Sequence, residues 1–316
     1  MKILVTGARG YVGSQLVAYL EKARHQVVPL FRSSRGVKNT GITIDLSDPA
    51  ARLLKFDEVD AIIHCAGAAH KPFGTPDSVF QAGNVAAAAN LAKAAVISNI
   101  KRVIMVSTVS VYGNKSYGSA IDEAWDLNAT DSYGGSKRRG EAAVAEILRE
   151  SETDLIVVRP ATVVGPNAPG NVQKLIMLLK KNRFVNIGNG SNVKSFVHID
   201  DLCGALEVIA TGDKKISAVF NVSAPPISVK QVVATICDEL ERSVPRVHLP
   251  GRLVSVITRA AASITRIKRV RHLAESTSTW LRHDSFTSKY LDSVYTLKYS
   301  AEEGIRDQVR EILTRQ

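Results

Sequence analysis

Tyr133 and Lys137 are the residues of this chain whose types and spacing best suit proton chemistry. Residues four apart on a helix lie on one face, so the phenol and the ammonium would be neighbours. A nearby cation favours the phenolate. It would lower the tyrosine pKa from an ordinary value of about 10 and make the group a useful acid or base near neutral pH. The pair therefore predicts a site that moves a proton to or from a substrate oxygen.

Two hydroxyl side chains, Ser107 and Thr108, stand at the end of a predicted strand that begins at Arg102. Doubly wound sheets bind ligands at the carboxyl ends of their strands, so a hydroxyl there can reach a bound substrate. The alternative for Thr108 is an ordinary strand-end hydroxyl that bonds to backbone. Its place beside the predicted tyrosine and lysine favours a catalytic role.

A glycine-rich turn joins the first predicted strand to a helix that should begin near Tyr11. Its glycines, Gly7, Gly10 and Gly13, allow a tight turn, close approach of a pyrophosphate to the backbone, and tight contact between helix and sheet. The helix N-terminus would supply N–H groups and partial positive charge for the pyrophosphate. A merely flexible turn is the alternative, but the strand before it and the helix after it favour a dinucleotide-binding motif.

The end of the second predicted strand bears on the choice between NADP and NAD. An acidic residue there would bind the adenosine ribose of NAD, but this chain has Arg32 and Ser33. A cation and a hydroxyl suit the extra phosphate of NADP, with Arg9 as a helper, whereas a solvated surface arginine would leave NAD as the cofactor. Asp45 and Leu46 could contact the adenine ring, although this stretch is also typical of a helix start.

The elements that must position these residues alternate regularly. Short β-branched runs and longer stretches with helical periodicity follow one another in the first half of the chain, a pattern typical of βαβ units. We predict an α/β fold with a doubly wound parallel sheet. The expected strands are Lys2 to Thr6, Gln26 to Phe31, Ile42 to Asp45, Ala61 to Cys65, Arg102 to Ser107 and Leu155 to Arg159. The expected helices are Tyr11 to Ala23, Ser78 to Ser98 and Tyr133 to Glu150.

Beyond Pro160, glycine and proline punctuate shorter elements, which predicts a smaller, discontinuous α/β substrate lobe. We expect the dinucleotide-binding domain to span residues 1–165, with residues 196–222 returning to it. Residues 166–195 and 223–316 would form the substrate lobe, with a helix from Asn171 to Lys181 over the active site.

Composition excludes several classes of protein. The chain has 316 residues, 45% hydrophobic and 22% charged, which is ordinary globular usage and argues against disorder. Its three cysteines are widely spaced, without the short spacing of metal or redox sites, so we expect no metal and a reducing, cytoplasmic location. The sequence contains neither a signal peptide nor an apolar run long enough to cross a membrane, so we expect a soluble protein.

The formal net charge of +11 is concentrated in one segment. Residues 252–271 carry six basic side chains and no acidic one, interleaved with apolar residues as in a basic amphipathic helix. Such a helix could rest on anionic lipid, but packing on the substrate lobe with solvated arginines is the interpretation that we favour. The segment lacks interleaved aromatic residues, so we expect no nucleic-acid partner.

Taken together, these features resemble the extended short-chain dehydrogenase/reductase family, in particular its branch of sugar-nucleotide epimerases, dehydratases and ketoreductases. The resemblance spans nearly the whole chain and implies a Rossmann domain. It depends on the glycine turn and on ordered motifs at His64 to Gly67, Asn84-Val85, Val106 to Gly113, Tyr133 to Lys137, Arg159-Pro160, Gly165-Pro166, Ser195 to Leu202, Phe220 to Val222 and Ser300 to Ile305.

The resemblance implies a role for each matching residue. Tyr133 would exchange a proton with a sugar hydroxyl or ketone, Lys137 would hold the nicotinamide ribose, and Thr108 would hydrogen-bond the reacting oxygen. Lys194 matches the basic position for the nucleotide diphosphate of a nucleotide-sugar substrate, and a homodimer would form through two of the predicted helices. The motifs and the resemblance together predict cofactor contacts from Gly7, Arg9, Gly10, Tyr11, Gly13, Arg32, Asp45, Leu46, Ala66, Gly67, Asn84, Ser107, Tyr133, Lys137 and Pro160.

The residues after Thr108 narrow the reaction. Dehydratases of this family carry an Asp-Glu pair there, because elimination of water needs a further acid and base, whereas this chain has Val109-Ser110. We therefore expect an epimerase or ketoreductase acting at carbon four of a nucleotide-linked sugar, similar to UDP-glucose 4-epimerase, and not a dehydratase. The alternatives are an NADPH-dependent reductase of a non-sugar carbonyl and a non-catalytic dinucleotide-binding protein.

Overall fold

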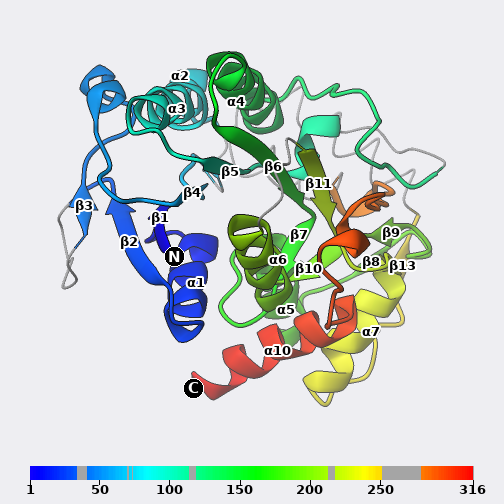
Figure 1. The fold of residues 1–316 in the computed structure, drawn as a ribbon. Helices are drawn as coiled ribbons and strands as arrows, with labels where there is room; N and C mark the ends of the chain where they lie inside the picture. The colour runs from blue at the N-terminus through cyan, green and yellow to red at the C-terminus, as the bar shows by residue number, and fades with distance from the viewer. Residues whose placement is uncertain are drawn as a thin grey trace.

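A seven-stranded sheet forms the centre of the molecule, and all its neighbouring strands run parallel (Figure 1). It is seen in a computed structural model that describes residues 1–33, 41–69, 71–72, 74–113, 119–212, 218–250 and 279–315. The strand order is β11-β6-β5-β4-β1-β2-β3. The strands are β1 (Lys2–Thr6), β2 (Gln26–Phe31), β3 (Ile42–Thr43), β4 (Ala61–His64), β5 (Arg102–Val106), β6 (Asp154–Pro160) and β11 (Ala218–Val222).

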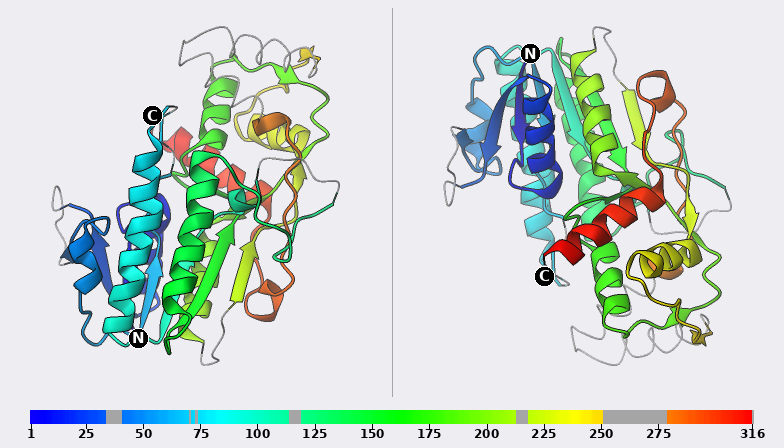
Figure 2. Two further views of the ribbon diagram at one scale, coloured as in Figure 1. Left: turned by 90° about the horizontal axis from the view of Figure 1, so that it is seen from above. Right: turned by 90° about the horizontal axis from the view of Figure 1, so that it is seen from below.

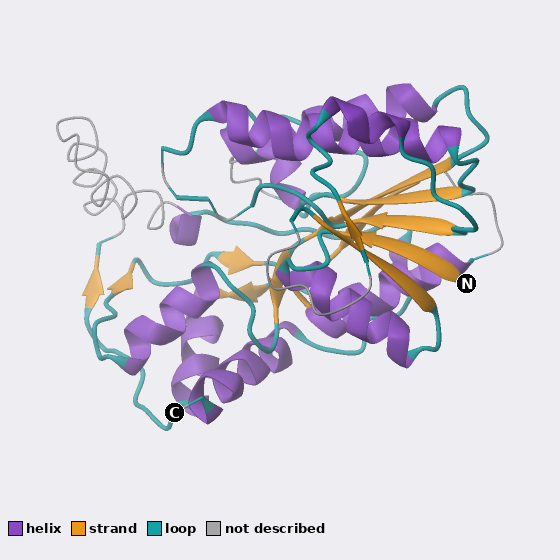
Figure 3. Ribbon diagram, turned by 90° about the vertical axis from the view of Figure 1, so that its left-hand side faces the viewer, coloured by secondary structure: helices purple, strands orange, loops and turns teal. Residues whose placement is uncertain are grey.

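Helices cover both faces of this sheet (Figures 2 and 3). Helices α1 (Tyr11–Lys22) and α6 (Ile199–Thr211) lie on one face, while α3 (Ala87–Ile97) and α4 (Ser132–Leu148) lie on the other. The central strands β4 and β5 are buried at every position, as expected of parallel strands enclosed on both sides. Each face has its own apolar core, so the predicted doubly wound α/β fold is confirmed.

A second lobe lies beyond the carboxyl ends of β6 and β11. Its helices α5 (Asn171–Lys180), α7 (Val229–Glu239) and α10 (Ala301–Thr314) share a separate apolar core. Capping boxes begin both α7 and α10, where Ser228 pairs with Gln231 and Ser300 with Glu303. Short strand pairs complete the lobe: β7 (Thr162–Val164) with β10 (Phe196–His198), β9 (Val193–Lys194) with β12 (Ile227–Ser228), and β8 (Asn186–Ile187) with β13 (His248–Leu249).

The structure corrects three expectations about the elements. Strand β3 ends two residues earlier than predicted, because Asp45 turns the chain by accepting hydrogen bonds from the backbone and hydroxyl of Ser47. The helix expected over residues 78–98 is divided into α2 (Asp77–Phe80), the π-helical η2 (Gln81–Ala86) and α3. In the segment 196–222, β11 joins the main sheet, but β10 pairs with β7 instead.

Three further expectations concern the basic segment, the absence of a membrane span and the division into domains. The basic segment 252–271 lies outside the described residues. Among the residues that are described, no helix combines the length and apolar character needed to cross a bilayer. The division of the chain into a dinucleotide-binding domain and a substrate lobe stays a proposal.

Candidate functional site

The glycine turn forms a close-packed cradle between β1 and α1. Gly7 has a φ of +68°, and a Cβ added to it would lie 2.6 Å from the backbone nitrogen of Ala66. A Cβ at Gly13 would lie 2.2 Å from the carbonyl oxygen of Gly7, so side chains are excluded at both positions. In the part of the chain that the structure describes, no side chain caps α1 at Gly10, and its first turn contains no acidic residue. The cradle thus fits a dinucleotide pyrophosphate.

Positive side chains gather where β2 ends. Arg9 lies over the Phe31 ring, with its guanidinium carbon 5.4 Å from the ring centroid, and donates a hydrogen bond of 3.5 Å to Ser33 Oγ. The Nε of Arg32 donates to the carboxylate of Asp45 over 2.9 Å. The arginines are therefore placed where the sequence predicted a phosphate of NADP, but Asp45 compensates one of them.

Asp45 and Leu46, the two residues predicted to contact adenine, have other partners in the structure. The Asp45 carboxylate is engaged by Ser47 and Arg32, and the side chain of Leu46 is buried in the apolar core against α3. The helix start in this stretch is capped by Asp48, which accepts a hydrogen bond from Ala50. A contact of Asp45 and Leu46 with adenine stays a prediction.

Tyr133 and Thr108 meet at the carboxyl edge of the sheet. Asp131 caps helix α4 by accepting hydrogen bonds from the backbone nitrogens of Tyr133 and Gly134, which fixes the tyrosine in the first turn. Thr108 follows β5, and its hydroxyl bonds to Ser110 over 3.2 Å. The Thr108 side chain lies close enough to the Tyr133 phenol to lower its pKa. The structure therefore brings together the two hydroxyls that the sequence placed at a reaction centre.

The acidity of Tyr133 differs from the sequence-based expectation. Burial raises the pKa of the Tyr133 phenol above its ordinary value, and this effect exceeds the lowering of the pKa by the Thr108 hydrogen bond. Lys137 was expected to lower this pKa, but its ammonium donates to the carbonyl oxygen of Val106 over 2.7 Å. The expectation of a lowered pKa is therefore wrong for the protein without its cofactor, and Tyr133 is a neutral phenol at neutral pH.

Lys137 lies in a closely packed part of the site. Burial lowers its pKa to about 8, although Glu141 and then Cys65 raise it. A Cβ added to Gly67 would lie 2.9 Å from the Asn84 side-chain oxygen and 3.8 Å from the Lys137 Nζ. Gly67 is therefore packed against both of these groups. Ala66, Gly67, Asn84 and Lys137 are thus neighbours, as the resemblance implied for residues around a cofactor.

Asn84 lies on the π-helical segment η2 and is fully buried. Its side-chain oxygen accepts from the backbone nitrogen of Ala68 over 2.6 Å, and its amide nitrogen donates to Ser136 Oγ over 2.8 Å. Ser136 directly precedes Lys137 on α4. The local widening of the helix places Asn84 against α4, and π-helical turns are frequent at functional sites.

The sequence analysis missed a buried polar network beneath Thr108. Glu141 on α4 accepts a hydrogen bond from Ser107 and forms an ion pair with Arg159 on β6, in which Arg159 Nη2 lies 2.6 Å from the carboxylate. Arg159 also donates to the Tyr112 hydroxyl over 2.9 Å, and Tyr112 in turn donates to Asn221 over 2.8 Å. A signal was present, since Glu141 is four residues after Lys137 and so falls on the same helix face.

Lys194 lies on β9 in the second lobe, and its partners belong to the protein. Its ammonium forms an ion pair of 2.6 Å with Asp284 and donates to the carbonyl oxygen of Thr279. Only 6% of Lys194 is exposed, and burial lowers its pKa. Arg282 shares the same carboxylate. The positive charge expected to meet a substrate diphosphate is thus compensated by Asp284, and the binding role of Lys194 stays a prediction.

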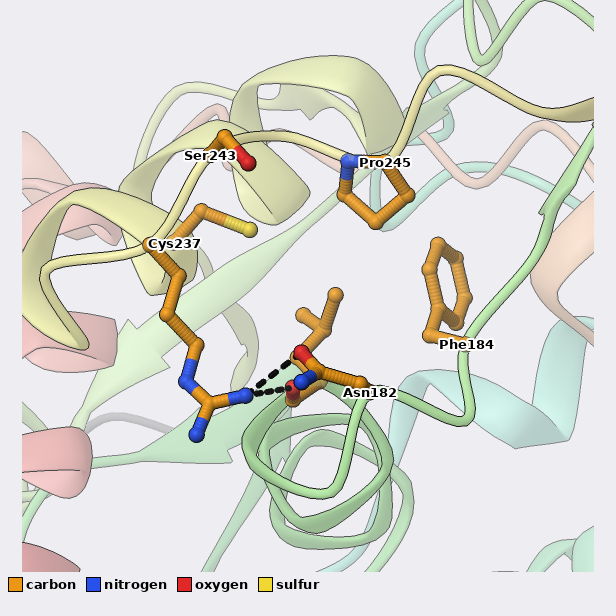
Figure 4. Close-up of a pocket in the computed structure, with 7 residues that line it drawn as sticks. Asn182, Phe184, Cys237, Ser243 and Pro245 are labelled. Atoms are coloured by element: carbon orange, nitrogen blue, oxygen red, sulfur yellow. Dashed lines mark hydrogen bonds between the residues drawn. The ribbon is translucent and has the colours of Figure 1, made fainter.

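A pocket in the second lobe lies apart from these residues (Figure 4). Phe184 and Pro245 form one side, and Cys237 directs its sulfur into the hollow from α7. Arg242 and Asn182 also line the pocket, and the Arg242 guanidinium donates a hydrogen bond of 2.5 Å to the Asn182 side-chain oxygen. None of the predicted site residues is among those that line it, so it carries no part of the proposed chemistry.

Residues 3–223 match the model of the NAD dependent epimerase/dehydratase family. The chain belongs to this family. That assignment confirms the resemblance drawn from the motifs and makes the chain an NAD(P)-dependent enzyme.

Relatives in the NAD dependent epimerase/dehydratase family include two epimerases. The chain is 27% identical to a UDP-glucose 4-epimerase of Vibrio cholerae, with 78% of each chain covered. It is 26% identical to an N-acetyl-alpha-D-glucosaminyl-diphospho-ditrans,octacis-undecaprenol 4-epimerase of Escherichia coli O157:H7, with 97% of each covered. It is also 30% identical to a 2-alkyl-3-oxoalkanoate reductase of Stenotrophomonas maltophilia (strain K279a), with 74% of each covered.

One solved structure of similar fold is MoeE5 in complex with UDP-glucuronic acid and NAD. It aligns over 100% of both chains with a TM-score of 0.77 and 24% sequence identity. At this identity the likeness shows the fold, and it agrees with the seven-stranded sheet and second lobe described above.

Proposed function

We propose that this protein epimerises or reduces a nucleotide-linked sugar at carbon four, with Tyr133 as the general acid and base. The observation that carries the proposal is that Tyr133 and Thr108 lie together at the carboxyl edge of the sheet, close enough for Thr108 to lower the pKa of the tyrosine, with Lys137 one helical turn away. The two epimerase relatives act, by their names, at carbon four of a sugar attached to a diphosphate, which supports this choice of substrate.

The residues of the site divide the chemistry between them. The glycine cradle would hold a nicotinamide dinucleotide, and the chemistry that this group would supply there is hydride transfer to or from the sugar carbon. The Tyr133 phenol donates its proton to a ketone oxygen at that carbon, and in the reverse direction the phenolate accepts the hydroxyl proton. Thr108 orients the reacting oxygen through its own hydroxyl. Lys137, one helical turn after Tyr133, would donate to the nicotinamide ribose of the bound dinucleotide.

The substitution Tyr133→Phe tests this proposal with UDP-glucose and UDP-galactose as probes. It removes the proton that the reaction needs, so turnover should fall by about 10²–10⁴-fold. Tyr290→Phe is the control, because the Tyr290 side chain is exposed and should not affect turnover. If Tyr133→Phe interconverts these sugars as fast as the wild type, the mechanism is wrong.

The cofactor gives a second test of the same proposal. Arg9, Arg32 and Ser33 at the end of β2 support NADP, while the NAD-bound structural relative and the ion pair of Arg32 with Asp45 support NAD. Mass analysis of the dinucleotide that remains bound after purification decides between them. Tightly retained NAD supports epimerisation, because an epimerase returns the hydride to the same sugar. Exchangeable NADPH supports reduction.

A reductase of a non-sugar carbonyl is the second candidate. It is favoured by the 30% identity to a 2-alkyl-3-oxoalkanoate reductase, in a match that covers 74% of each chain. NADPH oxidation with a 2-alkyl-3-oxoalkanoate, in the absence of any turnover of UDP-sugars, would select this candidate.

We also propose a cytoplasmic homodimer. The cysteines Cys65, Cys203 and Cys237 are free thiols, as in a reducing compartment.

An apolar surface patch on η1 (Pro49–Leu53) and α3 includes Leu53, with 68% of the residue exposed, and Ile97, with 47% exposed. Light scattering on the wild type and on Ile97→Lys would detect a dimer that depends on this patch.

A further inference from the structure

We propose that Glu141 is a positioning residue of the active site. Through Ser107 and Arg159 it fixes helix α4 against the ends of β5 and β6, and its negative charge compensates the buried Lys137 ammonium. This inference rests on the proposed function for its kinetic consequence, but its structural and titration consequences hold for the protein without substrate.

Glu141 joins the two elements that form the reaction centre. Helix α4 carries Tyr133 and Lys137, whereas Thr108 follows strand β5, so the reaction centre is assembled from two elements. Glu141 lies two helical turns after Tyr133 and joins both elements: it accepts the Ser107 hydroxyl hydrogen bond at the end of β5 and pairs with Arg159 near the end of β6. Two oxygens of the carboxylate meet two nitrogens of the guanidinium, at 3.2 and 2.6 Å, which fixes the direction of the helix.

The second part depends on the groups that face Lys137. They are the Val106 carbonyl from β5, His64 and Cys65 from the end of β4, and Glu141 from α4. Burial lowers the pKa of His64 to about 3 and raises the pKa of Cys65 to about 12, so both groups are neutral at neutral pH. Tyr133 is neutral as well, because burial raises its pKa.

Glu141 is therefore the charged group that faces Lys137 among these described neighbours, and it raises the lysine pKa against the effect of burial. An ammonium at this position would donate to a ribose hydroxyl of a bound dinucleotide. Without Glu141, burial would favour the neutral amine.

The test compares Glu141→Gln with Asp154→Asn. Asp154 forms the other buried ion pair of the same two strands, with Arg102, at their amino ends. Both substitutions replace a buried carboxylate by the amide of the same shape, so both should lower the thermal midpoint of unfolding. The titration of Lys137 is then followed in the cofactor-free protein by NMR of lysine labelled with ¹³C at Cε, and its signal is assigned by its loss in Lys137→Met.

In Glu141→Gln we expect the titration midpoint of Lys137 to move from about 8 to lower pH by roughly one unit. In Asp154→Asn it should stay at the wild-type value. For enzyme that turns over a UDP-sugar, Glu141→Gln should lower kcat with little change in KM, and the basic limb of the pH profile should move with the lysine. An unchanged midpoint in Glu141→Gln would show that the ion pair is merely structural and would overturn the proposal.

Glu141→Asp keeps the test decisive if Glu141→Gln does not fold. It retains the charge but shortens the side chain, so the Lys137 midpoint should remain near the wild-type value while kcat falls roughly tenfold to a hundredfold from misplacement of α4. A wild-type kcat in this variant would contradict the positioning role. The titration needs no substrate, so failure of the proposed sugar-nucleotide activity would leave it interpretable and the two failures distinguishable.

Discussion

A buried arginine–carboxylate pair lies at each end of strands β5 and β6, and at the carboxyl ends the carboxylate comes from helix α4. At the amino ends, Arg102 Nη2 lies 3.5 Å from Asp154, and Arg102 also donates to the carbonyl oxygen of Ile209 over 2.9 Å. At the carboxyl ends, Arg159 pairs with Glu141 over 2.6 Å. All four residues are at most 8% exposed, so the two pairs are similarly removed from solvent.

The two pairs differ in what surrounds them. Arg102 binds backbone carbonyls at the end of α6 and so fastens a helix to the sheet. Arg159 and Glu141 bind the hydroxyls of Tyr112 and Ser107, next to the groups that would exchange protons with a substrate. A buried ion pair is therefore no sign of function by itself. The carboxyl edge of the sheet and the adjacent lysine make the second pair part of a site.

The largest expected effect comes from removing the arginine of each pair. Arg159→Met leaves the Glu141 carboxylate buried and unpaired, which should cost about 3–5 kcal/mol of the free energy of unfolding and lower kcat by roughly a hundredfold, because α4 is no longer fixed. Arg102→Met should cost a similar amount of stability, about 3–5 kcal/mol, and leave kcat of the folded enzyme unchanged. Urea unfolding and turnover at saturating substrate measure the two quantities.

This prediction separates stability from function within one strand pair. If both variants lost kcat in proportion to stability, the two ends would be equivalent, and the distinction drawn above would be wrong. A buried lysine in place of the arginine, as Arg159→Lys, should recover part of the stability but not the two-pronged contact with Glu141.

The threonines at the two ends give a smaller, matched contrast. Thr108→Val removes the hydroxyl that lies close to Tyr133 and caps η3 (Val109–Tyr112), so kcat should fall by about tenfold to a hundredfold and stability by about 1 kcal/mol. Thr153 at the amino end donates to the carbonyl oxygen of Ile100 over 2.7 Å. Thr153→Val should lower stability by about 1 kcal/mol without lowering kcat. Equal kcat values for the two variants would remove Thr108 from the reaction centre.

Sequence patterns predicted the motifs at the carboxyl ends of these strands, but they did not predict the contacts between distant segments that hold the site together. The glycine turn, the strand-end hydroxyls and the Tyr133–Lys137 pair could be placed because local chain geometry fixes them: a turn of glycines and residues four apart on a helix need no knowledge of the fold. The network of Glu141, Arg159, Tyr112 and Asn221 depends on contacts between distant segments, and no periodicity encodes which carboxylate meets which arginine.

The sequence also misjudged how burial acts on the site. The pair spacing suggested that Lys137 would control the acidity of Tyr133, but desolvation depends on how closely β4, β5 and η2 pack around both groups. Lys194 is a similar case: the motif placed a cation in the second lobe, while the compensating Asp284 comes from a segment ninety residues later. Charge alone could not show that this cation already has a partner.

The last prediction concerns the cost in stability of burying Lys137. The pKa of Lys137 is about 8 in the folded protein, below the ordinary 10.5, so at neutral pH folding must bury an ammonium that burial disfavours. Lys137→Met removes this charge at nearly constant volume and should raise the free energy of unfolding at neutral pH by about 1–2 kcal/mol, after the lost hydrogen bond to Val106 is discounted. Activity should be lost in the same variant. Lys101→Met, at the exposed amino end of β5, should change stability by no more than about 0.5 kcal/mol.

The pH dependence of this gain has a definite sign. Between about 8 and 10.5 the unfolded chain binds more protons at this lysine than the folded protein does, so the wild type becomes relatively more stable as the pH rises through that window. The advantage of Lys137→Met should therefore be fully present below pH 8 and shrink above it, as urea unfolding at several pH values would show. An advantage that grew with pH, or a variant less stable than the wild type at neutral pH, would contradict this prediction. Either result would mean that the buried Lys137 ammonium stabilises the fold and does not lower the free energy of unfolding.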